Sequence, residues 1–232
     1  MLMPLVISAV MRSWTNFSMA VIVPTITVET NEQFQEASER VAPFARRIHI
    51  DLSDGEFAPT FLLNESQLYW PPEWEIDIHA MVARPSEHIP QLIAMKPNLI
   101  VIHAEVTENL IELLTQIKEA GIKAGLALLK TTVPAKIADA IQIADHIMIF
   151  SGELGKHGGT ASMMQLEKVR LIKAINPKAE IGWDGGVNIE NAYTLTQGGV
   201  EVLNTGGAIA NSENPAETYQ TLVREINKHG VI

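Results

Sequence analysis

Short runs of β-branched residues alternate with stretches of helical spacing along almost the whole chain, and this alternation limits the fold more than any other feature. Runs rich in Ile, Val and Thr favour strands, whereas a period of about 3.6 residues favours helices. Eight strand candidates follow residue 20 and recur about every 27 residues. They are VIVPTI from residue 21, RIHIDL from 47, EIDIHAM from 75, LIVIHAE from 99, KAGLALL from 123, HIMIFS from 146, EIGWD from 180 and VEVLNT from 200.

Segments with helical spacing lie between these runs or follow them. They span Asn31–Phe44, Ser86–Met95, Thr107–Ala120, Pro134–Ile143, Met163–Ile175, Ile189–Gln197 and Pro215–Lys228. Residues 58–74 contain prolines and little helical period, which predicts a loop with at most a short helix. Alternating strands and helices favour parallel βαβ units, and eight such units predict an α/β fold, a closed (βα)8 TIM barrel. A doubly wound open sheet is the alternative.

The two ends of the chain differ in character. No linker divides residues 19–232, so we expect one catalytic barrel domain there. Residues 1–18 are apolar up to Met11, but Arg12 interrupts them well short of the roughly 20 residues of a membrane span. They also lack the basic start of a secretory signal. We expect a disordered extension or a start codon assigned too early; a tail that contacts a membrane or a partner is the alternative.

Charge and cysteine content exclude several classes of function. A net charge of -10 and the lack of any Lys/Arg-rich run argue against nucleic acid or an anionic membrane as a partner. The chain has no cysteine, so His, Asp or Glu must bind any metal, and a cytoplasmic location fits best.

The polar residues at the strand ends predict a metal site. Catalytic groups in such barrels lie where the strands end. His49 and Asp51 are two positions apart in one strand, so their side chains point to the same face. With His79 and Asp184 from two other strand ends, they offer two imidazoles and two carboxylates at the barrel mouth. This set suits one divalent ion such as Zn, Mn, Fe or Co.

Three loops after late strands are rich in glycine: SGELGKHGGTA, DGGVN and NTGGAI. Glycine lets backbone N–H groups approach an oxyanion, and phosphate often binds after strands 7 and 8 of such barrels. The sequence therefore predicts a phosphate-binding site in these loops. Its candidate residues are Gly155, Gly158, Gly159, Gly185, Gly186, Gly206 and Gly207.

Several of these motifs resemble one enzyme family. HIDLSDGEFAPT, DIHAMVARP, KAGLAL, IGWDGGVN and NTGGAI are similar, in register, to segments of ribulose-phosphate 3-epimerases. The resemblance implies a (βα)8 barrel, a divalent metal ion, and inversion at C3 of a ketopentose 5-phosphate. It places the metal ligands at His49, Asp51, His79 and Asp184, and the two acid/base groups at Asp51 and Asp184. Barrels of this type often form homo-oligomers, which we also expect here.

This chemistry explains why two carboxylates are needed. A single base cannot easily reach both faces of a carbon, whereas two aspartates on opposite walls can remove and return its proton. Thr25 stands where the family has a serine, and it is a candidate substrate contact. Met81 shares the face of His79, where it either covers the site or simply packs. His103 and Glu105 resemble the family's strand 4 end and are expected to form hydrogen bonds near the metal.

Other polar and aromatic residues have structural interpretations. Asp54 and Asp77 either orient an imidazole or have structural roles, and a turn cap is at least as good an interpretation of Asp54. Trp183 precedes Asp184, so it should face away from the mouth and pack under a helix.

The sequence also departs from the family at the rim of the site. The loop after strand 6 is longer and carries Lys156 and His157, and the exit of strand 5 retains only Thr132 of the family pattern. Ser53 replaces a methionine. A ketohexose 6-phosphate is therefore an alternative substrate. A barrel that binds sugar phosphates without catalysis is the alternative from another class of function.

Overall fold

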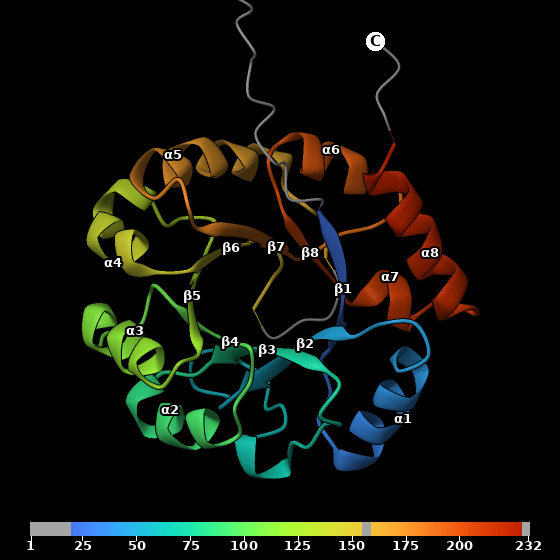
Figure 1. Cartoon of the computed structure of the whole chain (residues 1–232), viewed down its shortest axis with the longest axis horizontal. Coiled ribbons are helices and arrows are strands. Elements are labelled where there is room, and N and C mark those ends of the chain that lie inside the picture. Colours follow the sequence, from blue (N-terminus) through green and yellow to red (C-terminus); the bar gives the residue numbers. More distant parts are fainter. Residues whose placement is uncertain (1–19, 155–158, 229–232) are drawn as a thin grey trace, which may run out of the picture.

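The computed structural model describes residues 20–154 and 159–228, and in them eight parallel strands close into a barrel in sequence order (Figure 1). The strands are β1 Val21–Ile26, β2 Arg47–Ser53, β3 Glu75–Met81, β4 Leu99–His103, β5 Lys123–Leu128, β6 His146–Phe150, β7 Glu180–Asp184 and β8 Val202–Thr205. This confirms the predicted (βα)8 barrel and excludes the open sheet. Residues 1–18, with the predicted extension, lie outside the described residues.

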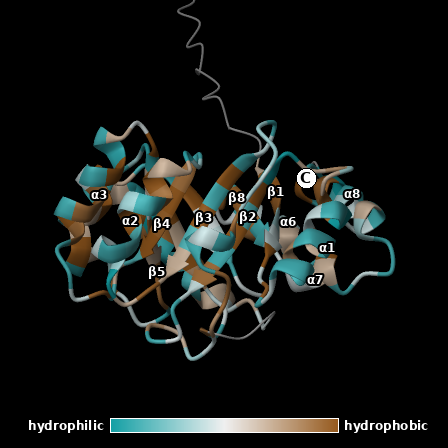
Figure 2. Ribbon diagram, turned by 90° about the horizontal axis from the view of Figure 1, so that it is seen from below, coloured by the Kyte–Doolittle hydropathy of each residue, from teal (hydrophilic) through white to brown (hydrophobic). Residues whose placement is uncertain are grey.

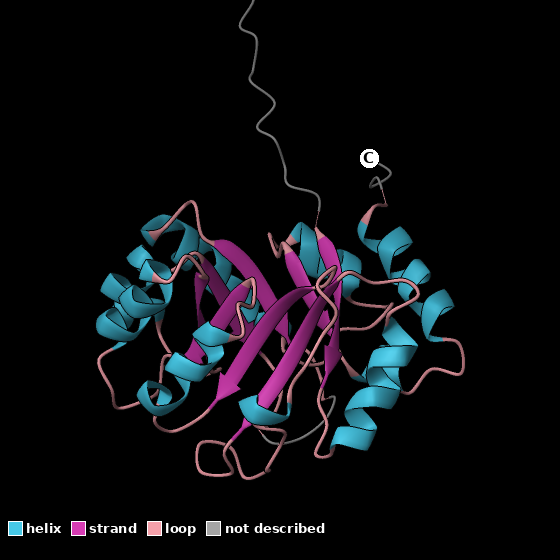
Figure 3. Ribbon diagram, turned by 60° about the horizontal axis from the view of Figure 1, so that its bottom comes forward, coloured by secondary structure: helices cyan, strands magenta, loops and turns pink. Residues whose placement is uncertain are grey.

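Helices form a ring around the barrel (Figure 3). The α-helices are α1 Asn31–Val41, α2 Pro85–Ala94, α3 Leu110–Glu119, α4 Ala138–Ile143, α5 Glu167–Ile175, α6 Ala192–Gln197, α7 Gly207–Ala210 and α8 Pro215–Ile226. Short 3-10 helices are η1 Glu65–Gln67, η2 Pro134–Ile137 and η3 Met163–Leu166. The β2–β3 connection thus contains only η1, as predicted. No helix in the described part of the chain has the length and apolar character needed to cross a bilayer.

Local sequence explains where several helices begin. Thr30 precedes α1 and forms a capping box with Gln33, which satisfies backbone N–H groups that the first helical turn leaves unpaired. Asn109 caps α3 through the N–H of Ile111. Asn214 caps α8, whose first residue is Pro215. These caps fix the points at which the chain leaves each loop of the mouth and turns back along the barrel.

The main apolar core lies between the strands and the helices (Figure 2). Along β2, Ile48, Ile50 and Leu52 face this core, so the alternate residues face the barrel interior. A smaller apolar layer closes part of that interior and consists of Leu99, Val101, Ala127, Met148 and Phe150. The interior is therefore packed, and the open space lies at the mouth.

Strand register brings distant polar residues to one level. Asp51 pairs with His79 between β2 and β3. On the opposite wall, Phe150 pairs with Asp184 and Asp184 pairs with Asn204. These residues lie near the carboxyl ends of their strands, so the barrel geometry itself assembles a polar layer at the mouth.

Candidate active site

Four buried side chains converge at the carboxyl ends of β2, β3 and β7: His49, Asp51, His79 and Asp184. We call them the mouth cluster. Each offers one nitrogen or oxygen atom, and these atoms all lie within 4.8 Å of one another. The structure thus brings the predicted ligand set together at a single point.

Asp51 makes the shortest contacts in the mouth cluster. Its Oδ1 lies 2.9 Å from His79 Nδ1 and 3.3 Å from His49 Nε2. Its Oδ2 accepts a hydrogen bond of 2.6 Å from Thr27 Oγ1. Asp184 lies farther away, with Oδ2 at 3.8 Å from His49 Nε2 and 3.7 Å from His79 Nδ1. Both carboxylates therefore face the same two imidazoles.

The two carboxylates have pKa values shifted in opposite directions. Burial opposes ionisation of Asp51, but the contacts with His49 and His79 outweigh it and lower the pKa of Asp51 well below its usual range. Burial raises the pKa of Asp184, and the negative charge of Asp51 raises it further. The surroundings thus favour ionisation of Asp51 and oppose ionisation of Asp184.

The donor set fits a divalent cation. His49 Nε2 is buried and has no hydrogen-bond partner among the described residues, although three other candidate ligand atoms surround it. A buried polar atom without a partner is costly, so this nitrogen indicates a ligand. Two imidazoles and two carboxylates are typical donors for Zn, Fe, Mn or Co.

A chain of hydrogen bonds connects the mouth cluster to β4. His79 Nε2 lies 2.8 Å from His103 Nε2, and His103 Nδ1 lies 3.2 Å from Glu105 Oε2. Glu105 Oε1 accepts hydrogen bonds from the backbone N–H of Leu129, at 2.9 Å, and from the Thr132 hydroxyl. His103 and Glu105 therefore form hydrogen bonds next to the candidate ligand His79, as predicted.

The direction of this chain fixes the tautomer of His79. Burial lowers the pKa of His103 to about 4, so its ring is neutral near pH 7. The Glu105 carboxylate only accepts, so His103 carries its proton on Nδ1 and accepts at Nε2. His79 must then donate from Nε2, so Nδ1, which lies 2.9 Å from Asp51 Oδ1, is the nitrogen that would bind a metal ion in place of a proton.

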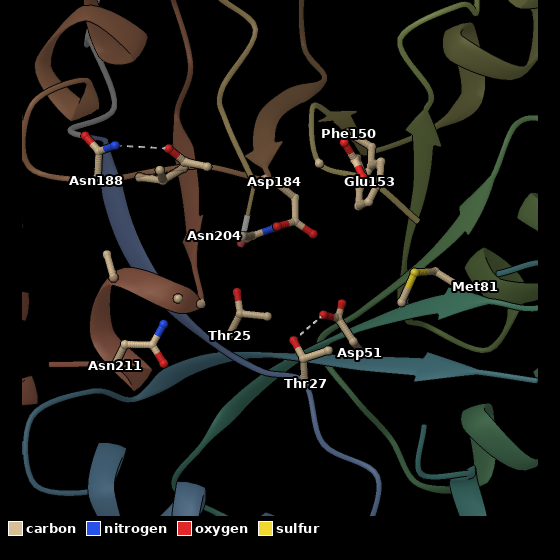
Figure 4. Close-up of a pocket in the computed structure, with 18 of the residues that line it drawn as sticks. Thr25, Thr27, Asp51, Met81, Phe150, Glu153, Asp184, Asn188, Asn204 and Asn211 are labelled. Carbon is tan, nitrogen blue, oxygen red and sulfur yellow. Dashed lines mark hydrogen bonds between the residues drawn. The ribbon is translucent and has the colours of Figure 1, made fainter. Parts of the chain in front are cut away.

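A pocket of about 280 Å³ opens above the mouth cluster (Figure 4). Asp51 and Asp184 line one end of it, and the glycine-rich loops after β7 and β8 line the other. Of the predicted phosphate-binding residues, the lining includes Gly159, Gly185, Gly186, Gly206 and Gly207. Gly155, Gly158, Lys156 and His157 lie outside the described residues. The pocket thus extends from the two acids to the loops predicted to bind phosphate.

Two of these glycines are also required by close packing of the loops. Gly185 and Gly186 have φ of +100° and +75°. A Cβ atom at Gly185 would lie 2.1 Å from Gly152 N, and one at Gly186 would lie 2.2 Å from Ala161 N. Asn191 donates to the carbonyl of Gly186 at 2.8 Å. The β6–α5 and β7–α6 loops therefore pack backbone against backbone beside the pocket.

Of the other residues singled out in the sequence, some line the pocket and others make structural contacts. Thr25 lines the pocket, and its buried Oγ1 has no partner among the described residues. Met81 both lines the pocket and packs with an apolar group under the β2–β3 loop. Asp54 accepts from backbone N–H groups of its own turn, and Asp77 pairs with Arg47, so both have structural contacts.

Trp183 is fully buried in the core between strands and helices, as predicted.

Sequence reasoning missed Thr27 and assigned no role to several other lining residues. Thr27 follows β1 by one position and shares the alternation of Thr25, which was the available signal. Phe150 and Asn204 also line the pocket, and both lie at strand ends that point into the barrel. Only the register between strands shows that they face Asp184.

Comparisons with known proteins agree with this architecture. The ribulose-phosphate 3 epimerase family matches residues 21–210. The chain is 29% identical over 169 residues to ribulose-phosphate 3-epimerase of Aquifex aeolicus (strain VF5), covering 70% of this chain and 76% of that protein. It is 30% identical over 177 residues to the enzyme of the same name from Helicobacter pylori (strain J99 / ATCC 700824), covering 72% and 80%.

A more distant structural similarity supports the fold alone. 3-Hexulose-6-phosphate synthase from Salmonella typhimurium superposes with a TM-score of 0.69 at 14% identity, covering 89% of this chain and 98% of that chain. Because the family match spans most of the barrel, with all four residues of the mouth cluster inside it, the chain belongs to the ribulose-phosphate 3-epimerase family.

Proposed function

We propose that this protein is a metal-dependent epimerase that interconverts D-ribulose 5-phosphate and D-xylulose 5-phosphate by inverting C3. One observation carries the proposal. Two buried aspartates, Asp51 from β2 and Asp184 from β7, point into the same space, and their pKa values shift in opposite directions. Inversion without redox chemistry needs such a pair, with one carboxylate ready to accept a proton and one ready to give it.

In one direction, the ionised Asp51 removes the C3 proton from one face of the sugar. Asp184, protonated at the start, delivers a proton to the other face. The roles reverse in the other direction. A divalent ion bound by the mouth cluster would act as a Lewis acid that stabilises negative charge on the substrate's oxygen atoms. Thr27, which donates to Asp51 Oδ2, holds that carboxylate in position while Oδ1 faces the imidazoles of His79 and His49.

The phosphate end of the substrate would bind at the loops after β7 and β8. Gly186, Gly206 and Gly207 line the pocket there, and the last two lie at the start of the short helix α7. This position matches the common phosphate site of (βα)8 barrels. Binding at that end would hold C3 between the two aspartates, so that proton transfer becomes a reaction within one complex.

Proton exchange in D2O tests the proposal directly. The protein, supplied with Zn, Mn, Fe or Co, is incubated with D-ribulose 5-phosphate, and C3 deuterium and D-xylulose 5-phosphate are followed by NMR. We expect both to appear. Their absence with every metal would exclude the function. A parallel reaction with a ketohexose 6-phosphate tests the longer substrate under the same conditions.

Metal analysis separates an epimerase from a barrel that only binds sugar phosphates. We expect about one equivalent of divalent metal in the wild type and loss of it in Asp184→Ala. A binder of phosphate alone would need neither the ion nor both aspartates. The glycine-rich loops are unchanged in Asp184→Ala, so inorganic phosphate should still bind, which controls for the integrity of the pocket.

A further inference from the structure

Asn204 is a buried polar residue of the pocket for which the proposed proton transfers have no use. It lies on β8 in register with Asp184 and has the same inward direction as Gly206, two positions later. Figure 4 shows it beside Asp184, on the wall that also carries Thr25. Asn204 is therefore placed between the acids at one end of the pocket and the phosphate-binding loops at the other.

In the described residues, the NH2 group of the Asn204 side chain has a partner, whereas its oxygen has none. Its Nδ2 lies 3.2 Å from Met148 Sδ, which fixes the direction of the amide. Its Oδ1 has no hydrogen-bond partner among the described residues, although the residue is only 3% exposed. Because buried carbonyl oxygens are almost always paired, this oxygen indicates a donor supplied by a bound molecule.

The chemistry of that donor is restricted. An amide oxygen only accepts hydrogen bonds, so neither a phosphate dianion nor a ketone oxygen can pair with it. A hydroxyl group can. In a ketopentose 5-phosphate whose C3 lies at the aspartates and whose phosphate lies at the loops, the group between them is the C4 hydroxyl.

We propose that Asn204 is a specificity-determining residue that accepts a hydrogen bond from the C4 hydroxyl of the sugar phosphate. The proposal rests on the proposed function, which supplies the ketopentose phosphate and the placement of its C3 and its phosphate. Such a hydrogen bond should make the enzyme prefer sugars that carry the C4 hydroxyl. Sites that hydrogen-bond a substrate hydroxyl discriminate against analogues that lack it, because the protein group is then left unpaired.

The test compares D-ribulose 5-phosphate with its 4-deoxy analogue, which keeps C3 and the phosphate. In the wild type we expect kcat/KM to favour the natural sugar by roughly 10-fold to 100-fold. In Asn204→Leu, which has nearly the same shape, the preference should fall to about twofold or less. Asn204→Ser keeps a hydroxyl oxygen on this wall and should retain part of the preference. Binding of inorganic phosphate, unchanged in both variants, controls for an intact pocket.

Each outcome decides a separate question. The proposal is overturned if Asn204→Leu keeps the wild-type preference in kcat/KM. It is also overturned if kcat/KM falls equally with both sugars, because Asn204 would then act through Asp184 and not through the C4 hydroxyl. If the wild type epimerises neither sugar, the proposed function fails. Affinities of the wild type and Asn204→Leu for the two sugars, measured by calorimetry, then decide the role of Asn204 on their own.

Discussion

The barrel interior contains two polar clusters at opposite ends of the same strands, and they differ in how their charges are compensated. The mouth cluster lies at the carboxyl ends of these strands. The second, which we call the base cluster, lies at the amino ends of β2, β3, β6 and β7 and consists of Arg47, Asp77, His146 and Glu180. Three strands therefore contribute to both.

The base cluster is complete in itself. Arg47 donates to Asp77 at 2.7 Å and to both oxygens of Glu180, at 3.0 and 2.9 Å. His146 Nδ1 lies 2.8 Å from Glu180 Oε2, and Asn98 donates to the second oxygen of Asp77. Each carboxylate faces a protein cation. These contacts join β2 to β7 across the base of the barrel and need no added ion.

In the described residues, no Arg or Lys pairs with the carboxylates of the mouth cluster. The ring nitrogens next to Asp51 and Asp184 belong to His49 and His79, and His49 Nε2 has no hydrogen-bond partner among the described residues. Similar residues therefore stabilise the fold in the base cluster, where Arg47 pairs with the carboxylates. In the mouth cluster they form a candidate site for binding a metal cation. Stability and function are thus separated along the barrel axis, as is general for (βα)8 barrels.

The largest expected effect comes from neutralising a carboxylate of the mouth cluster. Asp184→Asn should lower epimerase kcat by about 10,000-fold, because an amide neither gives nor takes the proton. The free energy of unfolding of the metal-free protein should not fall, because burial and the charge of Asp51 already disfavour the carboxylate that the variant replaces with a neutral amide. Steady-state kinetics and urea unfolding measure both. A variant with more than a few per cent of wild-type activity would remove Asp184 from the proton transfer.

Neutralising a carboxylate of the base cluster should instead lower stability and leave catalysis nearly unchanged. Glu180→Gln leaves Arg47 with a weaker partner, and we expect a loss of about 2–4 kcal/mol in the free energy of unfolding with kcat nearly unchanged. Urea denaturation measures the loss. Equal stability of variant and wild type would mean that the base cluster does not hold β2 and β7 together.

The pH dependence of that loss sharpens the comparison. Burial raises the pKa of Glu180, but hydrogen bonds from His146 and Arg47 outweigh it and place the pKa well below the ordinary 4.5. The ion pair therefore stabilises the fold fully above the pKa of the unfolded chain, and this contribution is lost as pH falls toward the folded value. The stability difference between wild type and Glu180→Gln should narrow from about pH 5 to about pH 3.

The sequence could predict the mouth cluster better than the base cluster. Alternation along β2 places His49 and Asp51 on one face, and both β2 and β3 were recognisable as strands. Arg47 begins β2, where a charged residue normally faces solvent. Its partner Glu180 is 133 positions away, and only the closure of the barrel brings the two together.

Positions past the strand ends were equally difficult to predict. Thr27 lies beyond β1, where strict alternation is no longer assured, and the role of Asn204 depends on its register with Asp184. Gly185 was predicted to bind phosphate, but its close approach to Gly152 requires the loop coordinates. Periodicity therefore predicts which residues face inward, whereas contacts between loops and across the barrel require the three-dimensional structure.

Two buried histidines provide the next contrast. His103→Leu removes the acceptor of His79 Nε2, so the affinity for the divalent metal should fall by roughly 10-fold to 100-fold. His103→Gln, whose amide oxygen can accept the same proton, should recover part of it. His146→Gln in the base cluster should leave metal affinity unchanged. Chelator competition measures all three, and an equal loss in His103→Leu and His146→Gln would attribute the effect to general destabilisation.

The smallest expected effect concerns Thr27, whose hydroxyl donates to the carboxylate of Asp51 from outside the mouth cluster. Thr27→Val keeps the shape of the side chain and removes the donor to Oδ2. A hydrogen bond to the charged form lowers a carboxyl pKa, so its loss raises the pKa of Asp51. The acid limb of the kcat/KM profile should move to higher pH by less than about one unit, with little change at pH 7, where Asp51 stays ionised in both proteins.

Thr221→Val on the outer helix α8 is the matched control, because Thr221 donates only to the carbonyl of Glu217 in its own helix. It should change neither the rate nor the pH profile. A lower rate in Thr27→Val without any movement of the acid limb would indicate that Thr27 positions the substrate or the β1–α1 loop. A moved limb would mean that the ionisation of Asp51 governs the rate, as expected of a residue that accepts the proton from the substrate.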